Sequence, residues 1–165
     1  MSRIIRFNKT KETNGWLSNM SAHPVKYDNK WWLTTEALFQ ALRFPEDSNV
    51  REIIRAEKSP MTAKMLAKKF NDLMVVKPCG PRDIENMKLM LRLKLTYNKE
   101  LKPELMATDE SMIIEDCSSR KASPWGAKFI DGVWVGENLL GKLWMEYRAE
   151  LMQVTCGLKS LRAPV

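Results

Sequence analysis

The apolar and polar positions in the first part of the chain predict short strands. Residues 4–7 form one candidate strand. Residues 25–27 and 30–33 flank Asp28-Asn29, a pair typical of a tight β-hairpin turn because both residues tolerate a positive φ. This region is therefore expected to hold one short strand and one small hairpin.

A second hairpin and a further strand are predicted in the last third of the chain. Residues 128–130 and 133–135 flank Asp131-Gly132, which is the strongest hairpin signal in the sequence. Residues 112–114 are apolar throughout and predict a short buried strand. Both hairpins are small, so strands contribute little of the expected fold.

Helical signals occupy most of the remaining sequence. Thr34 or Thr35 caps a helix that runs to about residue 44, and residues 47–49 cap the next one. Ser59-Pro60 begins a helix to residue 70, and Pro81 begins the clearest long helix. One stripe of this long helix is formed by Ile84, Met87, Leu91 and Lys94. A final helix is predicted from residues at helical spacing on one face: Leu140, Leu143, Trp144, Tyr147 and Leu151.

Together these elements predict a helix-rich α+β fold with small β-hairpins, in one domain covering residues 1–165. The composition, 44% hydrophobic and 28% charged, is typical of a globular protein with a real core. Eleven methionines, many on helical stripes, are expected to fill that core. No signal peptide and no membrane-spanning stretch is recognised, so we expect a cytoplasmic protein without a membrane partner.

The net charge and the few cysteine and histidine residues indicate which partners and which kinds of catalytic or metal site to expect. The net charge of +7 favours an anionic partner, whether a nucleotide in a pocket or a nucleic acid in a groove. Cys79, Cys117 and Cys156 are far apart and include no C-x-x-C pair, which argues against disulfides and zinc. His23 is the only histidine, so Ser-His-Asp catalysis is disfavoured, and we expect no metal and no cofactor.

Residues 136–142 match the first seven positions of a phosphate-binding P-loop. The eighth position is Leu143, which cannot ligate magnesium as Ser or Thr does. Leu139, Leu140 and Leu143 also belong to the apolar face of the final helix. The segment is therefore interpreted as a glycine-led helix start with Asn138 near its N-terminus, not as a nucleotide-hydrolysing loop.

One helix and two loops carry the candidate chemistry. Glu36, Gln40 and Arg43 follow i, i+4, i+7 spacing and share a helix face, which is either functional or simply solvated. Ser18-Asn19 lies in a polar turn between large apolar groups, so it either meets a ligand or satisfies its own backbone. Glu115-Asp116 precedes a basic loop ending at Trp125-Gly126; its carboxylates and aromatic ring either hold a nucleobase or ribose, or the loop is exposed and Trp125 packs into the core.

Taken in order, these segments resemble the NADAR family of YbiA-like N-glycosidases, which are linked to NAD and ADP-ribose metabolism. The resemblance runs from about Phe7 to Leu151 and rests on Leu17-Ser18-Asn19, Glu36, Gln40, Arg43-Phe44, Met87, Lys94, Glu115, Trp125-Gly126, residues 136–141, Met145 and Arg148. It implies metal-independent hydrolysis of a bond between ribose C1 and an exocyclic ring amine. Characterised members cleave ribosylamino intermediates of riboflavin synthesis or remove ADP-ribose from guanine.

The resemblance also implies roles for residues. Breaking a ribosyl C–N bond develops positive charge on the sugar, so a carboxylate must stabilise that charge or activate water. Glu36 is the expected catalytic carboxylate, assisted by Asp116 or Glu115. The expected substrate-binding residues are Ser18, Asn19, Gln40, Arg43, Lys94, Glu115, Trp125, Gly126 and Asn138, with Asn19, Gln40 and Asn138 on ribose hydroxyls, Arg43 and Lys94 on phosphate, and Trp125 on the base.

The sequence departs from the family pattern at three places. Ala37 replaces a common histidine, Met20 replaces an aromatic residue, and residues 118–124 lack the usual aspartate. Either Asp116 takes that role through a rearranged loop, or the substrate or the activity differs. The net charge, with Arg120 and Lys121, favours ADP-ribosylated guanine over the smaller riboflavin intermediates as substrate, and a non-catalytic binder of ADP-ribose, nucleotides or nucleic acid is the alternative function.

Overall fold

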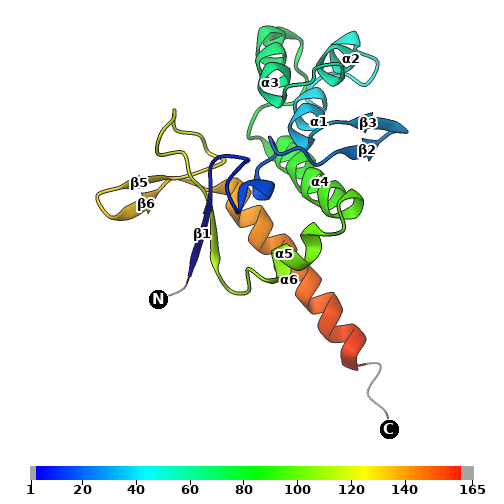
Figure 1. The fold of residues 1–165 in the computed structure, drawn as a ribbon. Helices are drawn as coiled ribbons and strands as arrows, with labels where there is room; N and C mark the ends of the chain where they lie inside the picture. Colours follow the sequence, from blue (N-terminus) through cyan, green and yellow to red (C-terminus); the bar gives the residue numbers. More distant parts are fainter. Residues whose placement is uncertain (1–2, 161–165) are drawn as a thin grey trace. The chain divides into compact units, whose positions relative to one another are not determined.

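The computed structural model describes the backbone of residues 3–160 and the side chains of residues 3–154. The chain forms two compact units (Figure 1). We call Phe7–Leu101 the central unit, and the N-terminal residues to Arg6 together with Lys102–Val165 the terminal unit. The side chain of Cys156 lies outside the described residues, whereas Cys79 and Cys117 are free thiols.

The central unit is built around the short helix α1. Its elements are η1 (Gly15–Leu17), β2 (Val25–Tyr27), β3 (Lys30–Trp32), α1 (Thr35–Ala41), α2 (Asn49–Arg55), α3 (Pro60–Lys69), η2 (Asn71–Leu73) and α4 (Pro81–Tyr97). α1 contacts α2, α3, α4 and β3, and all seven of its residues are buried. A helix of this length is unstable alone, so packing on every side must stabilise it.

Local signals for helix starts are confirmed. The side chains of Thr34, Ser48 and Ser59 each accept a backbone hydrogen bond at the start of α1, α2 and α3. α1 ends at Ala41, three residues before the predicted end. Pro45 accounts for the early stop, because the residue before a proline is disfavoured in helical conformation.

The predicted β2–β3 hairpin is also confirmed. Val25 pairs with Trp32 and Tyr27 with Lys30 in antiparallel register. Asp28 and Asn29 have φ values of 47° and 57°, as a two-residue turn of the mirror-image type requires.

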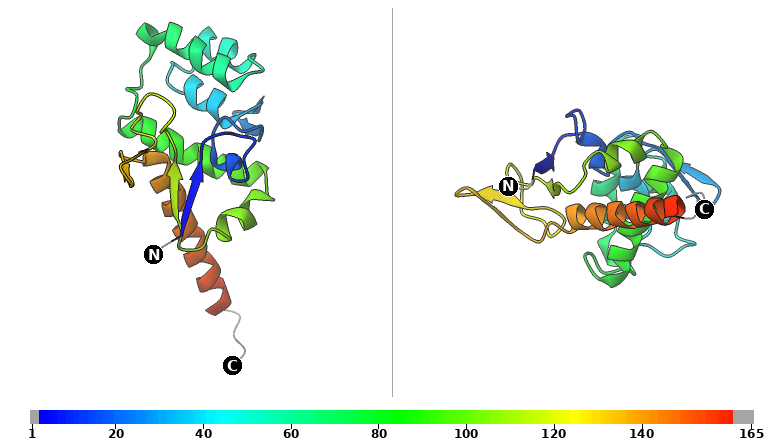
Figure 2. Two further views of the ribbon diagram at one scale, coloured as in Figure 1. Left: turned by 60° about the vertical axis from the view of Figure 1, so that its left-hand side comes forward. Right: turned by 90° about the horizontal axis from the view of Figure 1, so that it is seen from below.

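The terminal unit combines two short strand pairs with the longest helix of the chain. Its elements are β1 (Ile4–Phe7), α5 (Leu101–Met106), β4 (Met112–Glu115), β5 (Lys128–Ile130), β6 (Val133–Val135) and α6 (Leu139–Ser160). β1 pairs with β4, β5 pairs with β6, and α6 packs against β4 (Figure 2). Trp144 of α6 is fully buried in this core.

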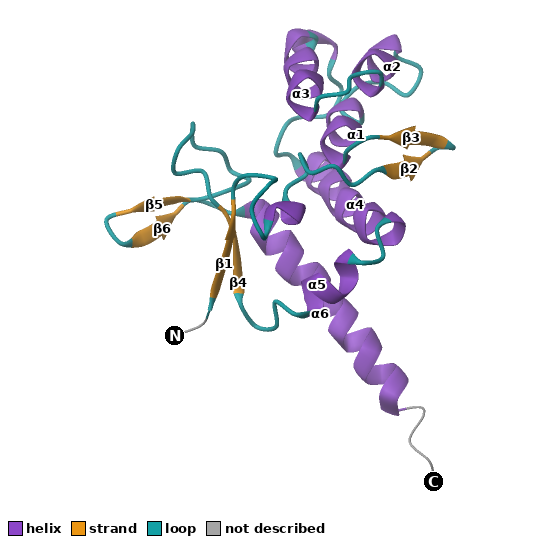
Figure 3. Cartoon of the chain, in the orientation of Figure 1, coloured by secondary structure: helices purple, strands orange, loops and turns teal. Residues whose placement is uncertain are grey.

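The helix-rich α+β prediction is confirmed, and Figure 3 shows the strands as short pairs among the helices. α5 was not predicted, because Pro103 lies near its start and hides the pattern; proline is nevertheless tolerated in the first helical turn. The single domain over residues 1–165 stays a prediction. No helix in the described part of the chain is long and apolar enough to cross a membrane.

The described methionines differ in exposure, and five of them, Met20, Met74, Met106, Met145 and Met152, are half-buried. Met87 and Met90 are buried in the core as predicted. Met61, Met65 and Met112 are about half exposed, at 56%, 58% and 43%, so the prediction is wrong for them. In α3 the cause is a narrow buried face made by small residues, which directs the longer side chains outward.

Candidate active site

Helix α1 carries a chain of three polar side chains that is buried in the central unit. Gln40 Nε2 donates to Glu36 Oε1 over 2.9 Å, and Arg43 Nη1 donates to Gln40 Oε1 over 2.9 Å. All three residues are at most 8% exposed. The shared face predicted from the i, i+4, i+7 spacing is therefore confirmed, and the alternative of a solvated face is wrong.

Asp83 completes this chain and was not predicted. Arg43 Nε and Nη2 donate to the two carboxylate oxygens of Asp83 over 2.9 and 2.8 Å. The backbone N–H of Cys79 also donates to Asp83, and the Arg43 guanidinium lies 4.6 Å from the centre of the Phe39 ring. Asp83 is fully buried, so the pair is a fixed internal ion pair.

The Glu36 carboxylate keeps one oxygen available. Gln40 is the only side-chain donor to Glu36 among the described residues, and its bond goes to Oε1. Oε2 therefore takes no hydrogen bond within this part of the chain. A carboxylate that is buried and held at one oxygen can act on a substrate through the other.

The Ser18-Asn19 loop is tied to the start of α1. Glu36 N–H donates to the Asn19 carbonyl over 3.0 Å, and the Thr35 hydroxyl lies 3.0 Å from Asn19 Oδ1. Asn19 Nδ2 in turn donates to the sulfur of Met87 over 2.9 Å. Asn19 therefore fixes the backbone at Glu36, and its own amide is already engaged.

Lys94 of α4 holds the same loop through hydrogen bonds. It is completely buried, and its Nζ donates to the Ser18 carbonyl and to Ser21 Oγ, each over 2.7 Å. Burial lowers the pKa of Lys94 from 10.5 to about 7. His23 Nδ1 lies 2.9 Å from the same Ser21 hydroxyl, so the single histidine is structural.

The depressed pKa of Lys94 predicts how stability depends on pH. Between pH 7 and 10.5 the unfolded chain holds a proton that the folded protein has released. Unfolding therefore takes up a proton, and the folded state becomes more stable as the pH rises through this window, by at most about 1.4 kcal/mol per pH unit. Below pH 7 this dependence disappears.

Urea unfolding at a series of pH values tests this expectation. Lys94→Met should abolish the rise between pH 7 and pH 9, whereas Lys99→Met, at an exposed lysine, should keep it. Parallel stability curves for wild type and Lys94→Met would contradict the buried-lysine assignment.

In the terminal unit, Asn138 braces strand β4. Its Oδ1 accepts the N–H of Glu115 over 3.0 Å, and its Nδ2 donates to the carbonyl of Ile113 over 2.8 Å. Its φ of 51° is a left-handed conformation that asparagine tolerates. Both ends of the amide are thus used inside the fold.

The loop at Trp125-Gly126 caps helix α6. The N–H groups of Asn138, Leu139 and Leu140 donate to the carbonyls of Gly126, Pro124 and Trp125 over 2.9–3.1 Å. The first amides of the helix are therefore not available to a phosphate, in agreement with the rejection of a P-loop.

Two glycines are required by close packing in this unit. A Cβ at Gly126 would collide with Cys117 and with the carbonyl of Glu115. A Cβ at Gly141 would collide with the carbonyl of Ile113 and the Asn138 side chain. The close backbone packing predicted from a glycine inside the last helix is confirmed, and Gly126 has a packing role.

Asp116 is held as an anion. Burial by itself would raise its pKa, but hydrogen bonds from Ser118 and the ion pair with Arg6, at 3.2 Å, bring the pKa below its ordinary range. Such a carboxylate can stabilise positive charge but is poorly suited to donate a proton. Beside it, Arg120 pairs with Glu115 over 2.6 Å, which offsets part of the positive charge expected of this loop.

The predicted residues thus form one cluster within each unit. In the central unit Lys94 bonds to Ser18, and the neighbouring Asn19 bonds to the backbone of Glu36. The side chains of Glu36, Gln40 and Arg43 continue this network as a hydrogen-bonded chain. In the terminal unit Glu115 ends β4 and Asp116 follows it, Trp125 and Gly126 lie in the loop that caps α6, and Asn138 directly precedes α6. No group of three or more potential metal ligands gathers among the described residues.

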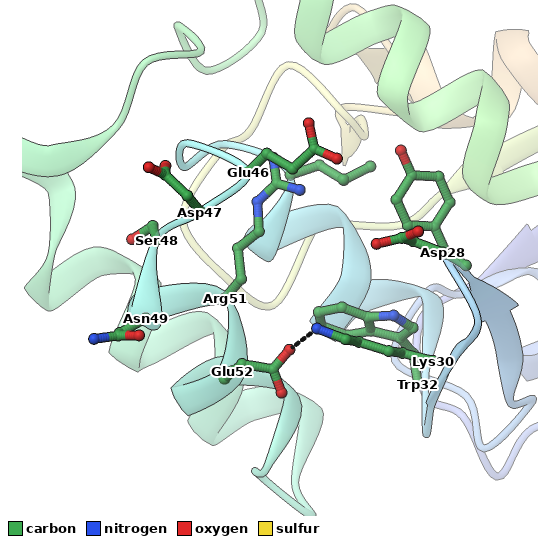
Figure 4. A pocket seen from close by; sticks show the side chains of 11 residues that line it. Asp28, Lys30, Trp32, Glu46, Asp47, Ser48, Asn49, Arg51 and Glu52 are labelled. Carbon is green, nitrogen blue, oxygen red and sulfur yellow. Dashed lines mark hydrogen bonds and ion pairs between the residues drawn. The ribbon is translucent and has the colours of Figure 1, made fainter.

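A separate pocket of about 230 Å³ opens in the central unit and contains none of the predicted residues (Figure 4). Its lining includes Asp28, Glu46, Asp47 and Glu52, and Lys30 donates to Glu52 over 2.6 Å. Trp32 also lines it, and the indole N–H of Trp32 has no hydrogen-bond partner within the described chain. Four carboxylates against two basic side chains, Lys30 and Arg51, leave the lining with a net negative charge, which disfavours an anionic substrate.

Comparison with known proteins agrees with this architecture. Residues 6–152 match the model of the NADAR domain. N-glycosidase YbiA of Escherichia coli strain K12 is 34% identical over 148 residues, which are 90% of this chain and 88% of that protein. An N-glycosidase of Nostoc punctiforme is 25% identical over 158 residues, which cover 89% of this chain and 92% of that protein. The NMR structure of E. coli YbiA gives a TM-score of 0.73 at 32% identity, covering 99% of this chain and 90% of that one.

Fold and relatives define an enzyme of the N-glycosidase class. The chain belongs to the NADAR domain family, as its motifs indicated.

Proposed function

We propose that this N-glycosidase cleaves the bond between ribose C1 and an exocyclic ring amine, with ADP-ribosylated guanine as the preferred substrate over ribosylamino intermediates of the riboflavin type. One observation carries the proposal. Glu36 is a buried carboxylate that is fixed at Oε1 and free of hydrogen bonds at Oε2 among the described residues.

The proposed chemistry uses that free oxygen. As the C–N bond breaks, its electron pair leaves with the amine nitrogen and positive charge develops at ribose C1 and its ring oxygen. Glu36 either stabilises this charge directly or accepts a proton from the water that attacks C1. The attacking water bonds to C1 through its oxygen and loses one proton, and the leaving nitrogen takes up one proton, so the products are a free amine-bearing ring and a ribose hydroxyl.

The remaining residues of the central cluster act by positioning Glu36. Gln40, Arg43 and Asp83 form a hydrogen-bonded chain that fixes Oε1, and Asn19 fixes the backbone of Glu36. Since the side-chain groups of Asn19, Gln40, Arg43 and Lys94 already have partners inside the fold, we assign them this supporting role rather than direct contact with ribose or phosphate.

In the terminal unit we assign Asp116 an electrostatic role. Its lowered pKa keeps it ionised at neutral pH, where it can stabilise a developing cation. Trp125 offers an aromatic ring for the base. Asn138 and Gly126 shape the loop that carries Trp125, since their contacts are made within the fold.

The proposed substrate order is tested by turnover of both substrate types, side by side, at low and moderate salt. The net charge of +7 should favour the polyanionic, ADP-ribosylated nucleic acid, and this advantage should shrink as salt rises. Preference for the small riboflavin intermediate at every salt concentration would reverse the order. Binding without release of a free base or amine from either substrate would favour a non-catalytic binder instead.

A further inference from the structure

Helix α3 and its flanking residues form one of the basic segments of the chain. Residues 58–77 contain five lysines, at positions 58, 64, 68, 69 and 77, and one acidic residue, Asp72. These 20 of 165 residues therefore contribute +4 to a net charge of +7. Such a cluster indicates a local surface for an anion more strongly than the net charge of the whole chain does.

One face of α3 combines this charge with apolar side chains. Met61, Lys64, Met65 and Lys68 follow i, i+3, i+4, i+7 spacing, so they lie on one face of the helix, which we call the Met–Lys face. All four residues are exposed, and Met61 and Met65 are 56% and 58% accessible. Lys64 and Lys68 form no ion pair with any residue that the structure describes.

Packing inside the central unit does not explain this face. Ala63 and Ala67 make the buried side of α3, which rests on α1 and α2. The Met–Lys face lies on a different side of the helix from Ala63 and Ala67, and its two methionines are more than half exposed. Two adjacent, flexible, polarizable side chains at an exposed position are typical of an adaptable binding surface.

We propose that the Met–Lys face binds a single-stranded nucleic acid. Lys64 and Lys68 provide charge for the phosphates, and Met61 and Met65 provide apolar contacts for bases or sugars. Those contacts require bases that are open to approach, which a single strand offers and a duplex does not. α3 packs against α1, the helix that carries Glu36, so the strand is bound by the unit that holds the proposed carboxylate.

This inference rests on the proposed function in one respect: cleavage of a modified nucleic acid explains why the protein would bind a strand. The binding itself is tested without measuring turnover. The probe is an unmodified single-stranded oligonucleotide, and its affinity is measured by fluorescence anisotropy over a range of salt concentrations. The test variant is Lys64→Ser with Lys68→Ser. The matched control is Lys9→Ser with Lys11→Ser, which removes the same charge from two exposed lysines elsewhere in the same unit.

The test variant should bind about tenfold more weakly than wild type at low salt. Its plot of log affinity against log salt should become shallower by about 1.4, because each phosphate contact on a single strand contributes about 0.7. Met61→Ser with Met65→Ser should weaken binding without changing the slope. The control should keep nearly the wild-type affinity.

Three results would overturn the proposal: equal losses in the test and control variants, a duplex that binds as tightly as the single strand, or anionic vesicles or polyglutamate that bind this face more tightly than the oligonucleotide. The variants should leave turnover of a small ribosylamino substrate unchanged. If wild type cleaves no ribosylated substrate yet binds the strand through these lysines, the proposed function fails and the binding surface stands.

Discussion

Glu36→Gln should fold normally and lose at least about 100-fold in the rate of N-glycoside hydrolysis, the usual scale for loss of an acid–base group. The substitution keeps the shape of the side chain and its Oε1 acceptor for Gln40, so the buried chain to Arg43 survives. It removes the negative charge at the oxygen that is free of hydrogen bonds within the described chain. Turnover at saturating substrate, with urea unfolding as a check of the fold, measures the effect.

Glu46→Gln is the matched control. Glu46 is an exposed glutamate that follows α1 and lines the separate acidic pocket. If the catalytic carboxylate is Glu36, Glu46→Gln should retain nearly full activity. A folded Glu36→Gln protein with near-normal turnover would remove Glu36 from the mechanism, and a large loss in Glu46→Gln alone would place the chemistry in the pocket instead.

Signals contained within a few residues predicted the structure well. Ser59-Pro60 begins α3, and Asp131-Gly132 forms the turn between β5 and β6, because caps and tight turns depend on the dihedral preferences and hydrogen bonds of the residues themselves. The shared face of Glu36 and Gln40 followed in the same way from helix geometry.

Contacts between residues far apart in the sequence were not predicted. Arg43 and Lys94 were predicted to meet phosphate because a basic side chain in a sequence shows its charge but not its partner. In the structure, Arg43 pairs with Asp83, 40 positions away, and Lys94 supports the carbonyl of Ser18, 76 positions away. Asp83 itself resembles an ordinary acidic residue in the first turn of a helix, where negative charge is favourable anyway.

The methionines illustrate the same limit. Periodicity places Met61 and Met65 on a stripe, as it does Met87 and Met90, but it does not say which side of a helix is covered. Small Ala63 and Ala67 show that α3 packs closely through its other side. A stripe of alanines opposite a stripe of methionines was the available signal for an exposed apolar face.

The second large effect is expected at Asp83. Asp83→Asn keeps the shape of the side chain but leaves the Arg43 guanidinium buried without a countercharge. Removing one partner of a buried ion pair costs about 3–5 kcal/mol, because the remaining charge is neither solvated nor compensated. Domains are stable by only about 5–15 kcal/mol, so the variant should unfold at a much lower urea concentration than wild type.

The control and a second variant separate this ion pair from general effects of charge. Asp72→Asn, at an exposed aspartate in the same unit, should change stability by no more than about 0.5 kcal/mol. Adding Arg43→Met to Asp83→Asn should recover part of the loss, because it removes the unpaired buried charge, although Gln40 then loses its donor.

Because Arg43 orients Gln40 and Gln40 holds Glu36, folded Asp83→Asn protein should also hydrolyse its substrate more slowly. Unchanged stability in Asp83→Asn would show that the ion pair is dispensable. Unchanged turnover in folded Asp83→Asn protein would show that the chain from Asp83 to Glu36 does not position the carboxylate.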